Sequence, residues 1–333
     1  MCGGIRPPGD AAHCRRMLGR YRVNRSLIAG ALGALFVVPA AQAAPVVLNF
    51  DVTSGGVTWE AIDNESAASD FNLSGVAGGG SAFAINDAST ANNGDAYDDA
   101  FAIAVNGETV PTSGGTVDVV AGAAGTTVTA DPVVPAGFSA NQQLFFFDGD
   151  PLVRLFFEIT NTGAAATTAT IEWATDLGAD SNSTVEVDSD GSGVLGSNDR
   201  FVVFSDDGAN DDPFTLFTFY GGGAGETPSI TGLFDQDDVN SLFELFLAPG
   251  ETKSLLFFGG VFDTVTSSIG EAAGFGSSLT GTLNRLGSDG FLTGLTDAQL
   301  ATVVNYAVPA PAPLALLGLG LAGLGAARRR RTR

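Results

Sequence analysis

The chain has 333 residues, 44% of them apolar, and a formal net charge of −22, so it is long enough for one large domain or two ordinary ones. Its 15 basic residues gather at the two ends, and the stretch from Ala44 to Val308 holds only 4 of them against 36 acidic residues, a net charge of −32. This excludes nucleic-acid binding by that stretch, because nothing in it could neutralise a row of phosphates.

Residues 1–43 have the features of a leader with a secretory signal peptide. Twelve apolar residues, 27–38, follow a group of arginines, and the stretch ends in a small-x-small site formed by Ala41 and Ala43. A basic region, a short apolar core and such a site are the signature of a signal peptide, and twelve residues fall short of the roughly 20 that a membrane span needs. We therefore expect signal peptidase to cut between Ala43 and Ala44.

The body that follows is dominated by β-type patterning. In the run 152–160, the side chains of Leu155, Phe157 and Ile159 share one face. Those of Arg154, Phe156, Glu158 and Thr160 fall on the other, which is the period of a strand. Trp173 points inward by the same alternation. Further strand candidates are 46–52, 101–105, 116–120, 143–147, 184–187, 201–204, 213–220, 242–247 and 254–258. Gly and Asp clusters separate these runs at short intervals, which favours a mainly β fold with an antiparallel sandwich.

The body divides by composition into a Gly/Asn-rich β region, 44–130, and a β-sandwich domain, 131–265. Two arrangements remain open at this point. The first region is either one sheet of a single large sandwich or a separate, smaller sandwich.

One loop has the pattern of a cation site. Across residues 188–199, the positions 1, 3, 5 and 12 of a twelve-residue calcium loop are Asp188, Asp190, Ser192 and Asp199, and position 6 is Gly191. Calcium prefers oxygen ligands, and the pattern resembles an EF-hand loop. Two departures keep a plain polar turn open as the alternative: the last acid is Asp instead of Glu, and the flanks are strand-like. Weaker acidic groups occur at 148–150, 206–207 with 211–212, and 235–240.

The available chemistry is narrow, because residues 44–308 contain no His, Cys or Met. Imidazole and thiol catalysis and the usual zinc sites are thereby excluded. Paired carboxylates could still form a glycoside hydrolase site, for which the strand-borne candidates are Glu158, Glu172, Glu186 and Glu244. Exposed aromatic side chains would instead indicate a carbohydrate-binding module, and the candidates are Trp59, Tyr97 and Tyr220. We expect a protein that is not an enzyme, with no organic cofactor.

Helical patterning is confined to a short segment, 266–307. A glycine-interrupted helix is predicted within 267–286. A second helix is predicted over 295–306, with Thr296 as N-cap, Gln299 three residues later, and an apolar stripe of Leu300, Val303 and Val304.

The C-terminal stretch, 308–333, combines a breaker, an apolar helix and a charged stop. Pro309, Ala310 and Pro311 precede an apolar run, 314–327, and the cluster Arg328, Arg329, Arg330 and Arg331 follows. Proline ends regular helix, and the 18 residues from 310 to 327 are about 27 Å of helix, enough for a thin bilayer. We expect a transmembrane helix with its arginines in the cytoplasm.

These three parts in this order resemble the PEP-CTERM sorting signal. The resemblance implies export in a Gram-negative bacterium, a transient inner-membrane anchor, and cleavage near the proline box by an exosortase-like enzyme. It also implies surface or matrix delivery in species that make exopolysaccharide. The usual Glu of the box is replaced by Ala310. The expected function is a structural or adhesive component of the cell surface or biofilm. The alternatives are a secreted carbohydrate-binding module or a carboxylate-based hydrolase.

Overall fold

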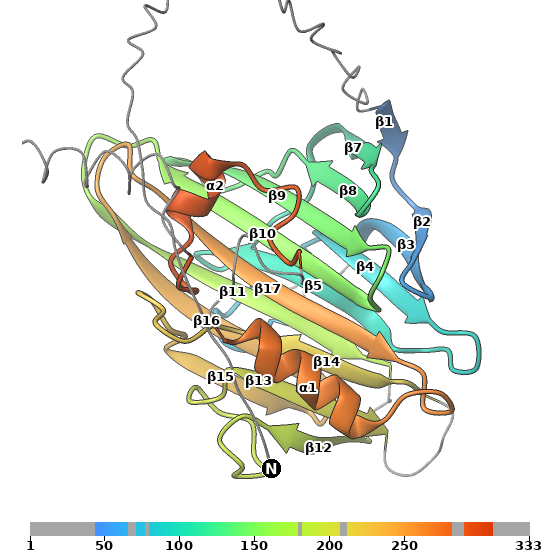
Figure 1. The fold of residues 1–333 in the computed structure, drawn as a ribbon. Coiled ribbons are helices and arrows are strands. Elements are labelled where there is room, and N and C mark those ends of the chain that lie inside the picture. Colours follow the sequence, from blue (N-terminus) through green and yellow to red (C-terminus); the bar gives the residue numbers. More distant parts are fainter. Residues whose placement is uncertain are drawn as a thin grey trace, which may run out of the picture. The chain divides into compact units, whose positions relative to one another are not determined.

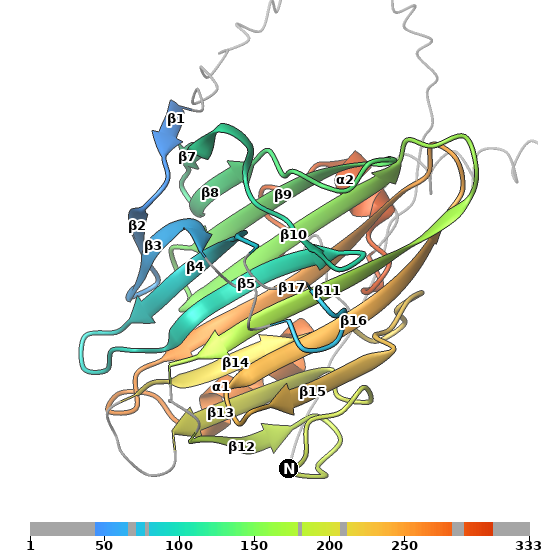
Figure 2. The same ribbon diagram turned by 180° about the vertical axis from the view of Figure 1, so that it is seen from behind.

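The structure is a computed structural model that describes residues 44–65, 71–76, 80–178, 182–206, 212–281 and 290–308. Strands account for 51% of the described residues and helices for 8%. Two antiparallel sheets face each other as a sandwich (Figures 1 and 2), which confirms the predicted mainly β, antiparallel body.

The first sheet has nine strands, and all of its pairs are antiparallel. In spatial order they are β1 (Ala44–Val47), β7 (Thr116–Ala121), β8 (Gly125–Ala130), β9 (Phe138–Phe147), β10 (Leu152–Asn161), β17 (Thr252–Phe262), β14 (Phe214–Thr218), β13 (Phe201–Asp206) and β12 (Ser183–Asp188).

The second sheet has eight strands. In spatial order they are β15 (Ile230–Phe234), β16 (Asp238–Leu247), β11 (Thr167–Leu177), β5 (Tyr97–Val105), β4 (Ala82–Ser89), β3 (Val57–Glu65) and β2 (Phe50–Ser54), with β6 (Glu108–Thr109) attached to β5. The compositional regions 44–130 and 131–265 contribute strands to both sheets, because β8 pairs with β9 and β5 pairs with β11.

The main core lies between the two sheets. The predicted inward row of Leu155, Phe157 and Ile159 is buried there. Trp173 is buried as predicted, and its ring stacks on Phe257 with 5.5 Å between the ring centroids. Close packing of large rings from both sheets replaces the disulfides that a cysteine-free body lacks.

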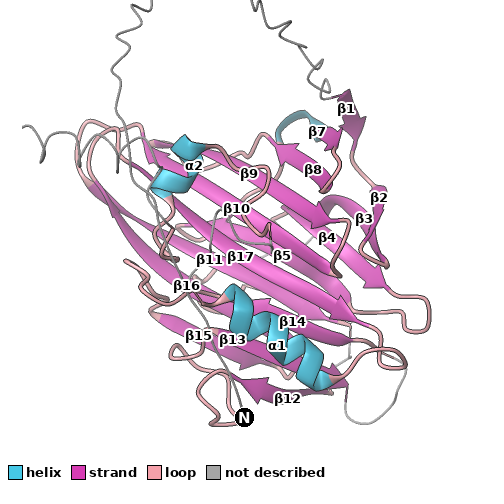
Figure 3. Ribbon diagram, in the orientation of Figure 1, coloured by secondary structure: helices cyan, strands magenta, loops and turns pink. Residues whose placement is uncertain are grey.

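A second apolar layer covers the outer face of the nine-stranded sheet. It is formed by helix α1 (Ile269–Leu279) and by residues 290–308, here called the C-terminal segment, which include helix α2 (Asp297–Thr302). Figures 1 and 3 show both helices on this one face. The segment buries its apolar side chains in the same cluster as the sheet, namely Phe291, Leu292, Leu295, Leu300 and Tyr306.

The predicted cap of the last helix is confirmed, but its length is not. Thr296 and Gln299 form a capping box. The helix ends at Thr302, and Val303 has extended backbone and forms a bridge with Ser254 of β17. Val303 and Val304, which the helical period assigned to an apolar stripe, therefore bond to β17 instead of continuing the helix.

The two predicted sorting segments lie outside the described residues. Ala41, Ala43, the proline box and the arginine cluster all belong to them, whereas Ala44 is the first residue of β1. Among the helices that the structure describes, none has the length and apolar character needed to cross a bilayer.

Candidate functional site

The predicted calcium loop connects β12 to β13 and is organised around Asp188. One oxygen of this carboxylate, Oδ2, accepts hydrogen bonds from the Ser192 hydroxyl at 2.9 Å and from the backbone N–H groups of Gly193 and Val194 at 2.6 and 3.1 Å. Asp190 in turn accepts the Ser192 N–H at 2.9 Å. Short side-chain-to-backbone bonds of this kind are the usual way in which Asp and Ser shape a turn.

Asp199 closes the loop from its far end. Its side chain is fully buried and accepts the N–H groups of Asp190 at 3.1 Å and Gly196 at 3.0 Å. Oxygen atoms of Asp188, Asp190 and Asp199 all lie within 4.8 Å of one another. The structure thus brings the three predicted acidic ligands together. The fourth predicted ligand, Ser192, donates its hydroxyl to Asp188.

The electrostatics of the loop differ between its two buried acids. Burial raises the pKa of Asp188, but the hydrogen bonds from Ser192, Gly193 and neighbouring N–H groups outweigh burial, so this pKa lies below its ordinary value. Burial raises the pKa of Asp199, and the charges of Asp190 and Asp188 add to that effect against two backbone hydrogen bonds. A bound cation would relieve this repulsion.

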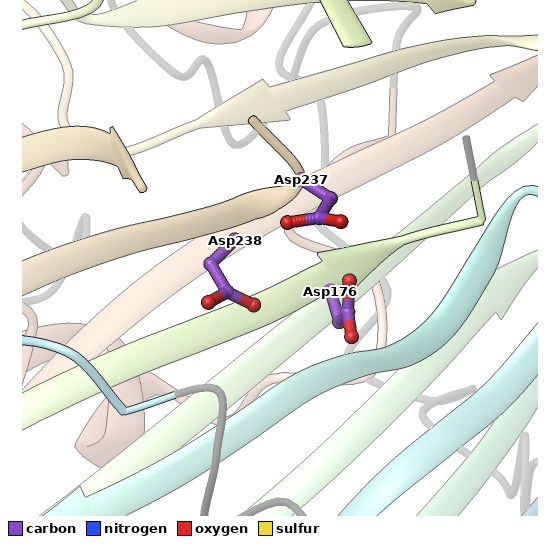
Figure 4. A group of neighbouring side chains, drawn as sticks. All are labelled: Asp176, Asp237 and Asp238. Carbon is purple, nitrogen blue, oxygen red and sulfur yellow. The ribbon is translucent and has the colours of Figure 1, made fainter. Parts of the chain in front are cut away.

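A second acidic cluster lies at the end of the eight-stranded sheet (Figure 4). It contains Asp176 of β11, Asp238 of β16 and Asp237 of the preceding turn, with carboxylate oxygens within 4.8 Å of one another. Asp176 and Asp238 stand directly opposite in the strand register, a placement that repels when both are charged. Asn72 donates to Asp238 Oδ2 at 2.7 Å. These buried and half-buried acids could in principle hold a metal.

Sequence patterning found two of the three acids of this second cluster. Residues 235–240 were predicted as a weak acidic group, whereas Asp176 was missed. It lies 62 positions before Asp238, and only the register of β11 on β16 places the two together. The group 148–150 does not form such a cluster among the described residues, and most of the group at 206–212 lies outside them.

The four candidate hydrolase carboxylates are divided between the two sheets: the register of β11 on β16 places Glu172 and Glu244 at diagonal positions on one face of the eight-stranded sheet, whereas Glu158 and Glu186 belong to the nine-stranded sheet. Glu172 is fully buried on the outer face of the eight-stranded sheet, where it accepts the N–H groups of Leu73 at 2.9 Å and Ser74 at 2.6 Å. Glu158 lies in the other sheet, near Thr302 of the C-terminal segment. Glu186 accepts the Ser205 hydroxyl at 2.6 Å, and Glu244 is exposed.

The structure corrects the prediction of an exposed aromatic binding surface. Trp59 and Tyr97 are both fully buried, and Trp59 packs on Phe146 with 5.6 Å between ring centroids. Tyr220 is half-buried, and its hydroxyl donates to Asn198 O at 2.9 Å. Strand alternation alone did not show which face of each strand was inward, so Trp59 and Tyr97 were candidates for exposed rings although they belong to the core.

A hollow of about 520 Å³ lies away from all of these residues. It is lined by Asn64, Val76, Ser81, Gly107, Glu108, Thr109, Pro111, Val133 and Val134. None of the predicted site residues lines it.

The chain matches no protein-family model and no curated protein. Among solved structures, it is similar to a putative kojibiose phosphorylase from the human microbiome, with 9% identity, TM-score 0.41, and coverage of 69% of this chain and 32% of that one. It is also similar to the Slr1438 protein from Synechocystis sp. PCC 6803, with 8% identity, TM-score 0.41, and coverage of 66% and 96%. A third is the GH36 α-galactosidase AgaA from Geobacillus stearothermophilus, with 11% identity, TM-score 0.36, and coverage of 65% and 40%. The chain spans less than half the length of the phosphorylase and of the galactosidase, and these similarities assign no family.

Proposed function

We propose that this protein is an exported, non-enzymatic component of the bacterial cell surface or extracellular matrix, with a structural or adhesive role in exopolysaccharide or biofilm. The observation that carries the proposal is that the carboxylate and aromatic side chains suited to catalysis or ligand binding are buried and stabilise the fold. Glu172 is buried and binds backbone N–H groups, and Trp59, Tyr97 and Trp173 form the core.

In this proposal, the two ends of the chain carry the signals for export and sorting. Signal peptidase would cut before Ala44, which leaves β1 intact because that strand begins at this residue. An exosortase-like enzyme of the inner membrane would then process the tail near Pro309, Ala310 and Pro311. The strongly acidic body would be the delivered part.

Mass spectrometry of the mature protein from cells and from medium tests this export route. We expect an N-terminus at Ala44 and a C-terminus that lacks Arg328–Arg331 in the surface fraction. A released form that keeps its arginine tail would contradict the sorting step, and a form that keeps residues 27–38 would contradict signal cleavage.

Calcium binding by the 188–199 loop is the finer part of the proposal. The supporting observation is the convergence of Asp188, Asp190 and Asp199, because close carboxylates favour an oxygen-preferring cation. Calorimetry in excess EDTA and then in millimolar calcium should show a higher melting temperature with calcium. The change Asp190→Asn should remove this gain, and Asp118→Asn, at an exposed acid on β7, should retain it. Coincident traces for the unaltered protein would rule calcium out.

A carbohydrate-binding role is the second candidate, and one observation favours it. Phe246 of β16 is 60% exposed, and Glu244 is exposed two positions before it, so an aromatic ring and an acceptor share one sheet face. Co-sedimentation with the producing strain's exopolysaccharide should weaken for Phe246→Ala and persist for Val133→Ala, a change at an exposed apolar residue elsewhere. Equal sedimentation of both variants would remove Phe246 from the proposal.

A further inference from the structure

Arg154 is the one fully buried basic side chain among the described residues, and nothing in the proposed function uses it. It belongs to β10 and points to the outer face of the nine-stranded sheet, where its exposed fraction is 0%. Its surroundings are the apolar layer beneath the C-terminal segment. The guanidinium carbon lies 5.0 Å from the centre of the Phe145 ring and 6.0 Å from that of Phe147.

Among the described residues, partners occupy one end of this guanidinium. Nη1 donates to the carbonyl oxygens of Phe291 and Thr293, both at 2.8 Å, and so fixes the turn that begins the C-terminal segment. Nε and Nη2 are buried and have no hydrogen-bond partner within the described residues. These two nitrogens form the edge of the guanidinium that binds a carboxylate or another anion side-on.

No carboxylate in the described part of the chain neutralises this charge. The ion pair found there joins Lys253 to Glu226 at 2.7 Å. Burial lowers the pKa of Arg154 to about 9, so the group is still charged at neutral pH. Buried charges in proteins are paired or fully hydrogen-bonded because leaving water is costly for an ion.

Gly294 lies beside the free edge. A Cβ placed at this residue would lie 3.7 Å from Nη2 and 3.2 Å from the Phe145 ring, and the second distance is tighter than an ordinary contact. The space between the backbone of Gly294 and Nη2 is therefore narrow, and no side chain of residue 294 fills it. A small ion fits such a position better than an extended ligand, because the surrounding layer is closely packed.

We propose that the Nε–Nη2 edge of Arg154 binds a small inorganic monovalent anion, with chloride as the probe. The anion would neutralise the buried charge and complete the hydrogen bonds of the guanidinium. Because Nη1 of the same group holds the turn at Phe291 and Thr293, anion binding would stabilise the docking of the C-terminal segment on the sheet. The site lies on the opposite sheet from the cluster of Asp176 and Asp238.

The test compares melting temperatures in sodium chloride and in sodium gluconate at equal ionic strength. Gluconate is too bulky for the space, so chloride should raise the melting temperature in a saturable way and gluconate should not. Arg154→Lys keeps a cation but lacks the side-on edge, so it should lose the chloride response. Arg200→Lys, at an exposed arginine, should retain it. A crystal soaked in bromide should show one anomalous peak beside Nε and Nη2.

Three results would overturn the proposal. The first is identical melting curves of the unaltered protein in the two salts. The second is an unchanged chloride response in Arg154→Lys. The third is electron density in which a water molecule or an oxygen atom of the protein occupies the edge in place of bromide. The bromide measurement uses the unaltered protein, so it decides the question even where a variant fails to fold.

Discussion

The outer faces of the two sheets are built on the same antiparallel pleat but carry opposite chemistry. On the nine-stranded sheet the outer face is apolar, and helix α1 and the C-terminal segment cover it. On the eight-stranded sheet the outer face carries acids such as Asp176, Asp238 and Glu244, and the described cover is the short segment 71–76.

The two covers are also held differently. Asn305 inserts its amide into the nine-stranded side, where it bonds to the N–H and the carbonyl oxygen of Leu256 and to Phe219 O at 2.6–2.9 Å. On the other side, Glu172 holds Leu73 and Ser74 above a floor of alanines, including Ala102 and Ala174. The comparison teaches that apolar packing and an inserted amide hold the cover of one face, whereas a buried carboxylate holds the cover of the other.

Removal of a ring from the covered face should give the largest effect. Phe258→Ala deletes a buried ring that packs edge-on against Phe291 and Tyr306, and we expect a loss of about 4 kcal/mol of unfolding free energy. Phe246→Ala on the acidic face should change stability by less than about 0.5 kcal/mol, because that ring is 60% exposed. Urea unfolding measures both, and equal losses would break the comparison.

The amide of Asn305 should come next. Asn305→Ala leaves the backbone groups of Leu256 and Phe219 without their partners, and we expect a loss of about 3 kcal/mol. Limited proteolysis should then cut within the C-terminal segment before the rest of the body is digested. Asn92→Ala is the control, because it removes the amide of an exposed residue, which donates to Asp263. A protease pattern identical to that of the unaltered protein would show that the apolar contacts alone hold the segment.

The hydrogen bonds of Glu172 on the acidic face should contribute less to the free energy of unfolding. Glu172→Ala leaves the N–H groups of Leu73 and Ser74 without an acceptor, and we expect a loss of about 2 kcal/mol. Glu172→Gln retains one acceptor oxygen and should lose less. Denaturant unfolding measures the loss, and hydrogen exchange at Leu73 and Ser74 reports on the segment itself. Unchanged exchange in the Ala variant would mean that the alanine floor, and not Glu172, holds the segment.

The smallest expected effect is a pH dependence on the eight-stranded side. Burial raises the pKa of Asp87 to about 6, and nearby Asp95 and Glu60 add to it against hydrogen bonds from Ala88 and Tyr97. The folded state therefore binds this proton more tightly than the unfolded chain does. The stabilisation is complete below about pH 4 and is lost as the pH rises through 6.

Asp87→Asn should remove this dependence. We expect the variant to gain less than about 1 kcal/mol at pH 7, after allowance for solvent screening, and to match the unaltered protein near pH 4. Urea unfolding across pH 4–7.5 measures the difference, with Asp118→Asn as the exposed control. A constant difference between the two proteins at every pH would contradict the assignment.

Short-range patterns were sufficient for part of this protein. The alternation in 152–160 predicted the buried face of β10, and Thr296 with Gln299 predicted the capping box. The spacing in 188–199 predicted that Asp188, Asp190 and Asp199 converge. Each of these is determined by residues within about one turn or one strand, where covalent connection already keeps the groups close.

Long-range placement was decided by the tertiary structure. Asp176 meets Asp238, Glu172 meets the 71–76 segment, and Arg154 meets the carbonyl of Phe291 only because strands and segments distant in the chain pack together. The period of a strand separates its two faces but does not tell which one is inward. The sequence therefore did not show that Trp59 and Tyr97 belong to the core. By itself, the sequence determined the strand pattern, the acidic charge of the body and the expected sorting ends. Register and packing then decided which acids are neighbours, which rings are buried, and where a buried arginine lacks a counter-ion.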